Sequence, residues 1–194
     1  MGLNHFAGRT AALVIALGVS GCSKAPLTSL RTGSMYPTLQ RQSRCVLQPV
    51  QQLGDLRVGH VITLKLQEAL VVRRVAGVPG DIIEADNGLY RRRGERPDRT
   101  LVTRSSMCLN GPSPRCTCEI WQERIGIRNV KVQRLSRTDI HDDIRCDPPL
   151  DADAVTVPAG HIYVLADNRD GAFDSRDLGP IPIRQVQARV LRCR

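Results

Sequence analysis

Two polar segments of this chain carry residue types that can do chemistry, and the first surrounds a serine. It contains Thr32, Gly33 and Ser34, followed by Pro37 and Thr38. A glycine lets the backbone approach a ligand closely, and a serine hydroxyl becomes a nucleophile when a neighbouring base removes its proton. A Gly-Ser pair in an ordinary loop is the alternative interpretation. The segment therefore indicates a candidate nucleophile but no base.

The second segment is a dense alternation of acidic and basic side chains. It runs from Asp167 to Arg176 and directly follows the apolar residues 155–166. Alternating Asp and Arg residues can form a buried network of ion pairs that supports a site. A solvated loop with local Asx turns is the alternative.

Both segments, together with residues 73–81, resemble motifs of the type I signal peptidase family of membrane-bound serine peptidases. Gly33 to Thr38 are similar to the motif GSMxPT, and residues 73–81 are similar to KRxxGxPGD. Residues 166–176 are similar to GDNRxxSxDSR. The three motifs occur in the family's order and with similar spacing, so the chain is identified as a member of that family.

The resemblance implies a Ser/Lys dyad, in which a serine attacks a peptide carbonyl and a neutral lysine takes its proton. Ser34 matches the nucleophile, and its backbone N–H and the Thr32 hydroxyl match the oxyanion hole. The implied substrate is an exported precursor protein, whose export signal has small residues before the cut and docks by strand addition. The resemblance also implies that five residues of the last motif support the site: Asp167, Asn168, Arg169, Asp174 and Arg176.

Arg73 occupies the position of the general-base lysine. Gly77, Pro79 and Asp81 hold the register of this motif, so a slip of one residue does not explain the difference. A buried lysine can act as a base because burial lowers its pKa, whereas the guanidinium of arginine has a pKa far above neutral and keeps its proton. We therefore expect Arg73 to hydrogen-bond Ser34 without accepting its proton.

Two further departures concern the same site. Ala172 stands where the family commonly has a serine whose hydroxyl orients the lysine, and Ala166 stands where it has a glycine. Lys65 is a candidate substitute base, although we expect it on the surface of an adjacent strand. His60 and His161 are poorer candidates, because relatives with a Ser/His dyad have the histidine at the lysine position.

These observations support two functions of different classes. The first is a membrane-associated serine endopeptidase, similar to signal peptidase I, that cleaves exported precursor proteins. The second is a catalytically impaired pseudopeptidase lipoprotein that binds extended peptides without cutting them. A structural module with neither property is a third interpretation. Cleavage that depends on Ser34 separates the first function from the second.

Residues 1–22 are typical of an export signal. The apolar run from Ala11 to Val19 is shorter than the ~18–20 residues that span a bilayer. The run ends in Val-Ser-Gly-Cys, which resembles a bacterial lipobox, and the cysteine of such a signal, here Cys22, is lipidated. A plain secretory signal is the alternative. We expect a lipid on Cys22 to hold the protein on the periplasmic side of a membrane. The inner and the outer membrane are both alternatives.

Export to an oxidising compartment changes the chemistry expected of the other six of the seven cysteines. In an oxidising compartment an even set of cysteines indicates disulfides, and their pairing stays open. Only one residue separates Cys116 from Cys118, which is a poor match to zinc-ligand spacing, so we expect no metal and no other cofactor. Four of the six lie between Cys108 and Cys146, where we expect a stapled insertion.

The composition excludes a disordered chain, because 41% of the residues are hydrophobic. The net charge is +9, and 25 of the 28 basic residues are arginine. Such an excess is also typical of nucleic-acid binding, but the arginines are scattered and the cluster at 91–99 has little aromatic interleaving. Attraction to anionic lipid is a further alternative. We expect a peptide or precursor-protein partner, a membrane partner through Cys22, and no nucleic acid.

Alternation of apolar and polar residues predicts a mainly β fold. We expect strands within 60–66, 69–76, 82–85, 125–135, 155–166 and 186–193. Residues 23–33 are interpreted as a polar linker, 86–118 as irregular and 136–154 as a loop. No long stretch with helical periodicity follows the export signal, which favours antiparallel sheets of the signal-peptidase type with a smaller Cys-bearing insertion.

The expected organisation has three parts. Residues 1–22 form the export signal, and residues 23–83 and 151–194 together form the peptidase-like core. Residues 84–150 form the insertion, which the cysteine spacing predicts to be stapled by disulfides.

Overall fold

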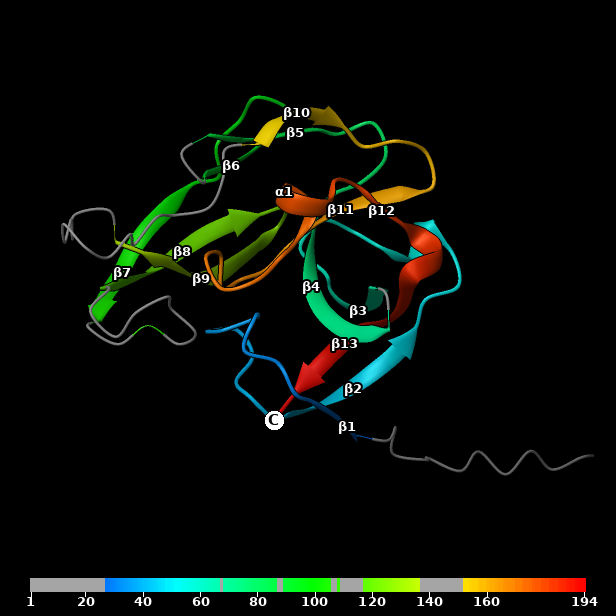
Figure 1. Ribbon diagram of the computed structural model, residues 1–194, viewed down its shortest axis with the longest axis horizontal. Coiled ribbons are helices and arrows are strands. Elements are labelled where there is room, and N and C mark those ends of the chain that lie inside the picture. The colour runs from blue at the N-terminus through cyan, green and yellow to red at the C-terminus, as the bar shows by residue number, and fades with distance from the viewer. Residues whose placement is uncertain (1–26, 67, 87–88, 106–107, 109–116, 137–151) are drawn as a thin grey trace, which may run out of the picture.

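The computed structural model describes residues 27–66, 68–86, 89–105, 108, 117–136 and 152–194, and these form strands almost throughout (Figure 1). One short helix, α1 (Ser175–Leu178), and two 3-10 turns, η1 (Leu53–Asp55) and η2 (Ile183–Gln185), interrupt the strands. The strands are β1 (Leu27–Leu30), β2 (Ser43–Pro49), β3 (Val61–Leu66), β4 (Ala69–Gly77), β5 (Ile82–Asp86), β6 (Leu89–Arg92), β7 (Arg99–Ser105), β8 (Cys118–Ile125), β9 (Arg128–Leu135), β10 (Ala152–Thr156), β11 (His161–Leu165), β12 (Ile181–Pro182) and β13 (Val186–Cys193).

The strands form three sheets in which all paired neighbours are antiparallel. The largest has seven strands in the order β1-β2-β13-β3-β4-β11-β12. Two three-stranded sheets have the orders β10-β5-β6 and β7-β8-β9, and Figure 1 shows the latter to one side of the seven-stranded sheet. The expectation of a mainly β, antiparallel fold is confirmed.

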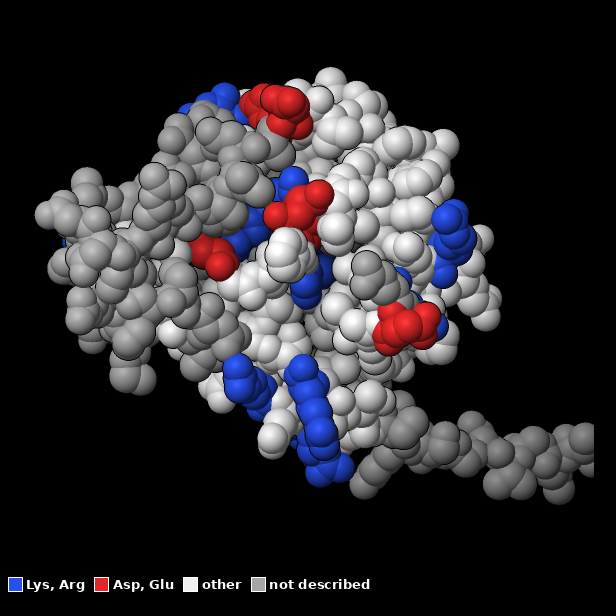
Figure 2. All heavy atoms as spheres, viewed as in Figure 1, with Lys and Arg blue, Asp and Glu red and all other residues white. Residues whose placement is uncertain are grey.

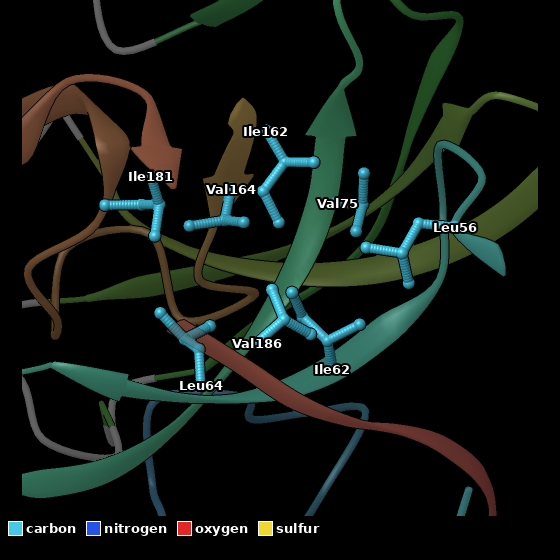
Figure 3. Packing of buried hydrophobic residues seen from close by; sticks show 8 residues of the cluster. All are labelled: Leu56, Ile62, Leu64, Val75, Ile162, Val164, Ile181 and Val186. Carbon is cyan, nitrogen blue, oxygen red and sulfur yellow. The ribbon is translucent and has the colours of Figure 1, made fainter. Parts of the chain in front are cut away.

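The main core lies against the middle of the seven-stranded sheet. Alternate residues of β3 and β11 point to the same face, because successive side chains of a strand point to opposite sides. Figure 3 shows this cluster, which consists of Leu56, Ile62, Leu64, Val75, Ile162, Val164, Ile181 and Val186. Each fully buried Leu or Ile contributes about 1.5–3 kcal/mol relative to an exposed one. The core therefore holds β3, β4 and β11 rigidly beside one another.

Several predicted strands are present, and three regions predicted to be irregular contain strands. β3, β4 and β13 lie where alternation predicted strands. The linker predicted at 23–33 is wrong at Leu27–Leu30, which pair with β2, and the irregular region predicted at 86–118 is wrong at β6 and β7. The loop predicted at 136–154 is wrong from Ala152, where β10 begins. These strands carry polar or charged residues, so their apolar alternation is weak. Pairing with a neighbouring strand determines their structure.

Two disulfides join described residues, a pairing that the sequence left open. Cys45 on β2 bonds Cys193 on β13, and Cys108 bonds Cys118 at the start of β8. The remaining cysteines, including Cys22, lie outside the described residues. The first bond links the last strand of the chain to its neighbour in the large sheet.

We expect Cys193→Ser to lower the free energy of unfolding by about 2–4 kcal/mol, because the lost bond closes a long loop of the unfolded chain. The two cysteines are 148 residues apart, against 10 for Cys108 and Cys118. Cys108→Ser is the matched control and should cost less, since a shorter loop carries less closure entropy. Urea unfolding of both variants measures the difference, and equal losses would contradict the loop-length argument.

Candidate active site

Ser34 lies in a tight turn between β1 and β2. Backbone hydrogen bonds close this turn from Tyr36 N–H to Gly33 O (3.3 Å) and from Leu39 N–H to Met35 O (2.8 Å). The Met35 side chain is fully buried and anchors the turn, which leaves the neighbouring Ser34 half-buried. The serine hydroxyl is therefore presented at the edge of the core.

Thr32 lies directly beside the Ser34 hydroxyl. Its Oγ1 is 2.7 Å from Ser34 Oγ and accepts the Ser34 backbone N–H at 3.1 Å. The two groups expected to form an oxyanion hole are thus adjacent, and here they bind one another. A carbonyl oxygen entering this position has to replace that internal hydrogen bond.

Arg73, on β4, is the nearest basic group to Ser34 in the described part of the chain. Its Nη1 donates to Ser34 Oγ at 2.8 Å and to the Val72 carbonyl at 2.6 Å. Its Nε and Nη2 both donate to the Phe173 carbonyl, at 2.9 and 2.6 Å. Arg73 is a donor in every one of these contacts, so it holds the serine without accepting its proton.

Burial lowers the pKa of Arg73 from its usual value, although the nearby Asp174 carboxylate opposes that effect. The side chain is only 5% exposed. Arginine nevertheless remains protonated at neutral pH, because the pKa of a guanidinium lies far above neutral. Arg73 is therefore a buried cation next to the candidate nucleophile.

Arg74, the next residue on β4, makes a bidentate ion pair with Asp167. Arg74 Nε and Nη2 donate to the two Asp167 carboxylate oxygens at 2.8 and 2.5 Å, and both side chains are buried. Arg74 also donates to the Gly59 carbonyl and to Thr38 Oγ1, at 2.8 and 3.2 Å. The pair connects β4, the segment after β11 and the serine turn.

Asn168 holds the serine turn from the other side. Its backbone N–H donates to Ser34 O at 2.9 Å, and its Nδ2 donates to Gly33 O at 3.3 Å. Gln133 of β9 in turn donates to Asn168 Oδ1 at 3.1 Å. Gly171 lies so close to this amide that a Cβ at position 171 would be only 2.6 Å from Asn168 Nδ2, so a glycine is needed there.

Asp174 organises the loop that covers Arg73. Its carboxylate accepts the Ala166 N–H at 2.8 Å and the Arg176 backbone N–H at 3.0 Å. The Arg176 guanidinium donates to both carboxylate oxygens at 2.9 Å. These bonds fix the backbone at Phe173, whose carbonyl contacts Arg73.

The Arg169 side chain binds a residue of β8. Its Nη2 pairs with Glu123 Oε2 at 2.9 Å, and both side chains are at most 2% exposed. The structure thus brings the polar segment into a paired network, and in Figure 2 acidic and basic side chains lie against one another near α1. The sequence offered no signal for the contributions of Glu123 and Gln133, which come from strands outside the three motifs.

The other candidate bases lie away from Ser34. Lys65 is half-exposed on β3 and pairs with Glu68 at 3.1 Å. His60 Nδ1 accepts the Arg57 N–H at 3.1 Å, and His161 Nδ1 lies 2.9 Å from the Ala159 carbonyl. In the described ranges, the hydrogen-bond partners of Ser34 come from residues 32, 72, 73 and 168. None of them is a lysine or a histidine.

The sequence that carries this site matches a family model over nearly its whole length. The family model for signal peptidase, peptidase S26, matches residues 4–193. The chain belongs to the peptidase S26 family of signal peptidases. Its function is accordingly signal-peptidase-like, and members of this family act on precursor proteins.

The sequence identity between this S26 chain and its individual relatives is low. It is 25% identical over 177 residues to "Signal peptidase I S" of Bacillus subtilis, which covers 90% of this chain and 79% of the relative. It is 27% identical over 133 residues to "Signal peptidase I" of Pseudomonas fluorescens, covering 66% of this chain and 41% of the relative. A crystal structure of a signal peptidase I from Enterococcus faecalis covers 74% of this chain and 99% of its own, at 16% identity and a TM-score of 0.41.

The signal peptidase I relatives are membrane-associated. Over the ranges that the structure of this S26 chain describes, no helix combines the length and apolar character needed to cross a membrane.

Proposed function

We propose that this S26 chain binds extended segments of exported precursor proteins and does not cleave them by the Ser/Lys mechanism. The observation that carries the proposal is the 2.8 Å hydrogen bond that Arg73 donates to Ser34 Oγ. A general base has to accept the serine proton, and a protonated guanidinium has no lone pair with which to do so. The candidate nucleophile is present, whereas Arg73 stands at the position where the family has its base.

The edge of β4 supplies a docking place for an extended peptide. β11 pairs with β4 only at Arg74, Val75 and Gly77. Ala69 to Arg73 pair with β3 on one side and, among the described residues, with no strand on the other. An extended peptide can add to such an edge through main-chain hydrogen bonds. The added strand would run past Ser34, which contacts the Val72 carbonyl at 3.4 Å.

The proposal includes a lipid anchor at Cys22 that places the protein on the periplasmic side of a membrane. Ser34 follows Cys22 by 12 residues. Such a linker extends at most ~40 Å, at 3.3–3.6 Å per residue. A lipid on Cys22 would therefore keep the peptide groove close to the membrane at which exported precursors emerge.

A second candidate function is a serine endopeptidase that processes exported precursors with a different base. The adjacent Thr32 and Ser34 hydroxyls favour it, since the nucleophile and both expected oxyanion groups are in place. This enzyme would need a base from outside the present contacts of Ser34.

One experiment separates the two functions. We expect the purified chain to bind a precursor peptide, and to hydrolyse it no faster than Ser34→Ala does, because no group is placed to deprotonate Ser34. Peptide binding is measured by fluorescence anisotropy and cleavage by mass spectrometry. Turnover that the Ser34→Ala substitution abolishes would refute the first function and establish the second.

A further inference from the structure

Arg73 differs from other buried arginines of this protein in its partners. The side chains of Arg74, Arg169 and Arg176 each meet a carboxylate, at 2.5 to 2.9 Å. Arg73 has no such ion pair among the described residues, and its contacts are a hydroxyl and two carbonyl oxygens. Asp174 and Asp177 both favour its charged form, and the Asp174 carboxylate is already bound by Arg176.

An isolated buried cation is costly, because its hydration is lost and no opposite charge replaces it. The contacts of Arg73 are all to neutral oxygens. A negatively charged group of a ligand would supply the opposite charge that the described residues do not pair with Arg73.

The donors around Ser34 show where that group fits. A guanidinium has five N–H donors, and the present contacts of Arg73 use Nε, both hydrogens of Nη1 and one hydrogen of Nη2. The second Nη2 hydrogen remains for a ligand. The hydroxyls of Thr32 and Ser34 lie 2.7 Å apart and hydrogen-bond one another, so a ligand oxygen that replaces this bond gains a donor from them. This set suits the two oxygens of a carboxylate.

The position of the site selects the kind of carboxylate. A peptide that adds to the unpaired edge of β4 runs to Ser34, whose hydroxyl contacts the Val72 carbonyl at 3.4 Å. If the peptide ends there, its terminal carboxylate lies against Arg73 and the two hydroxyls.

We propose that Arg73, with Ser34 and Thr32, binds the C-terminal carboxylate of an extended peptide docked along β4. The ligand class is a peptide already cut after a small residue, the product of an endopeptidase rather than its substrate. The inference rests on the proposed function, in which a peptide docks along β4. It adds that this docking is selective for a peptide with a free C-terminus.

The test compares two hexapeptides that end in alanine and differ only in a terminal carboxylate or amide. With the purified full chain in detergent, we expect the carboxylate form to bind roughly ten- to a hundredfold more tightly in fluorescence anisotropy, the range of one charge-assisted contact. A third peptide, extended by two residues beyond the alanine, should bind like the amide, since its charge lies beyond Arg73.

Two variants locate the preference. Arg73→Met should reduce the carboxylate-to-amide ratio to about one, because the cation that meets the terminal carboxylate is lost. Arg104→Met is the matched control, since it removes an exposed arginine on β7 that pairs with Glu119, and it should keep the wild-type ratio. Equal binding of both peptides to the wild-type chain would overturn the inference and leave the proposed function standing. Binding of neither peptide would overturn both.

Discussion

Arg73→Lys combined with Ala172→Ser is expected to give this chain hydrolytic activity that depends on Ser34. A lysine buried at this place has a lowered pKa and can accept the serine proton, whereas arginine cannot. The serine at 172 restores the hydroxyl that orients the lysine in the family. General-base catalysis contributes about 10²–10⁴-fold, so we expect at least ~10²-fold more cleavage than in the wild-type chain.

Cleavage of a precursor peptide followed by mass spectrometry measures this gain. The triple variant that also carries Ser34→Ala should return to background, which shows that the new activity uses the serine. Arg99→Lys is a matched control for the same chemical change at an arginine that packs over Trp121, 4.5 Å from its ring centre, and it should gain nothing. A correctly folded double variant without activity would show that Arg73 is not what blocks catalysis.

Asp167→Asn should lower the free energy of unfolding by about 3–5 kcal/mol, because it leaves Arg74 as an unpaired buried charge. Asp167 is fully buried and accepts two hydrogen bonds from Arg74, at 2.8 and 2.5 Å. The asparagine keeps the shape of the side chain and removes its charge. The variant therefore tests the ion pair and not the packing.

Urea unfolding followed by circular dichroism measures the loss. Lys65→Met is the matched control, because it breaks an exposed ion pair with Glu68, and such pairs contribute at most about 1 kcal/mol. A loss for Asp167→Asn no larger than that of the control would show that the segment after β11 is not held by this pair.

Much of the fold could be predicted from local pattern. Alternation of apolar residues placed β3, β4 and β13, because a strand with one buried face leaves that pattern in the sequence. β1, β6 and β7 were missed, because polar or charged residues weaken their alternation and they form where a partner strand is present. The disulfide pairing could not be predicted either, because it depends on which strands are neighbours.

Part of the candidate site could likewise be predicted from the sequence, and part required the structure. The identity of Ser34 and the inability of Arg73 to act as a base followed from the sequence, because the proton chemistry of a side chain is intrinsic to its type. Only the tertiary structure revealed that Arg73 binds the carbonyl of Phe173, 100 residues later, and lacks a carboxylate partner among the described residues. It also brought Gln133 and Glu123 to the polar segment. Contacts between such distant residues depend on strand order and register, which the residues of one motif do not encode.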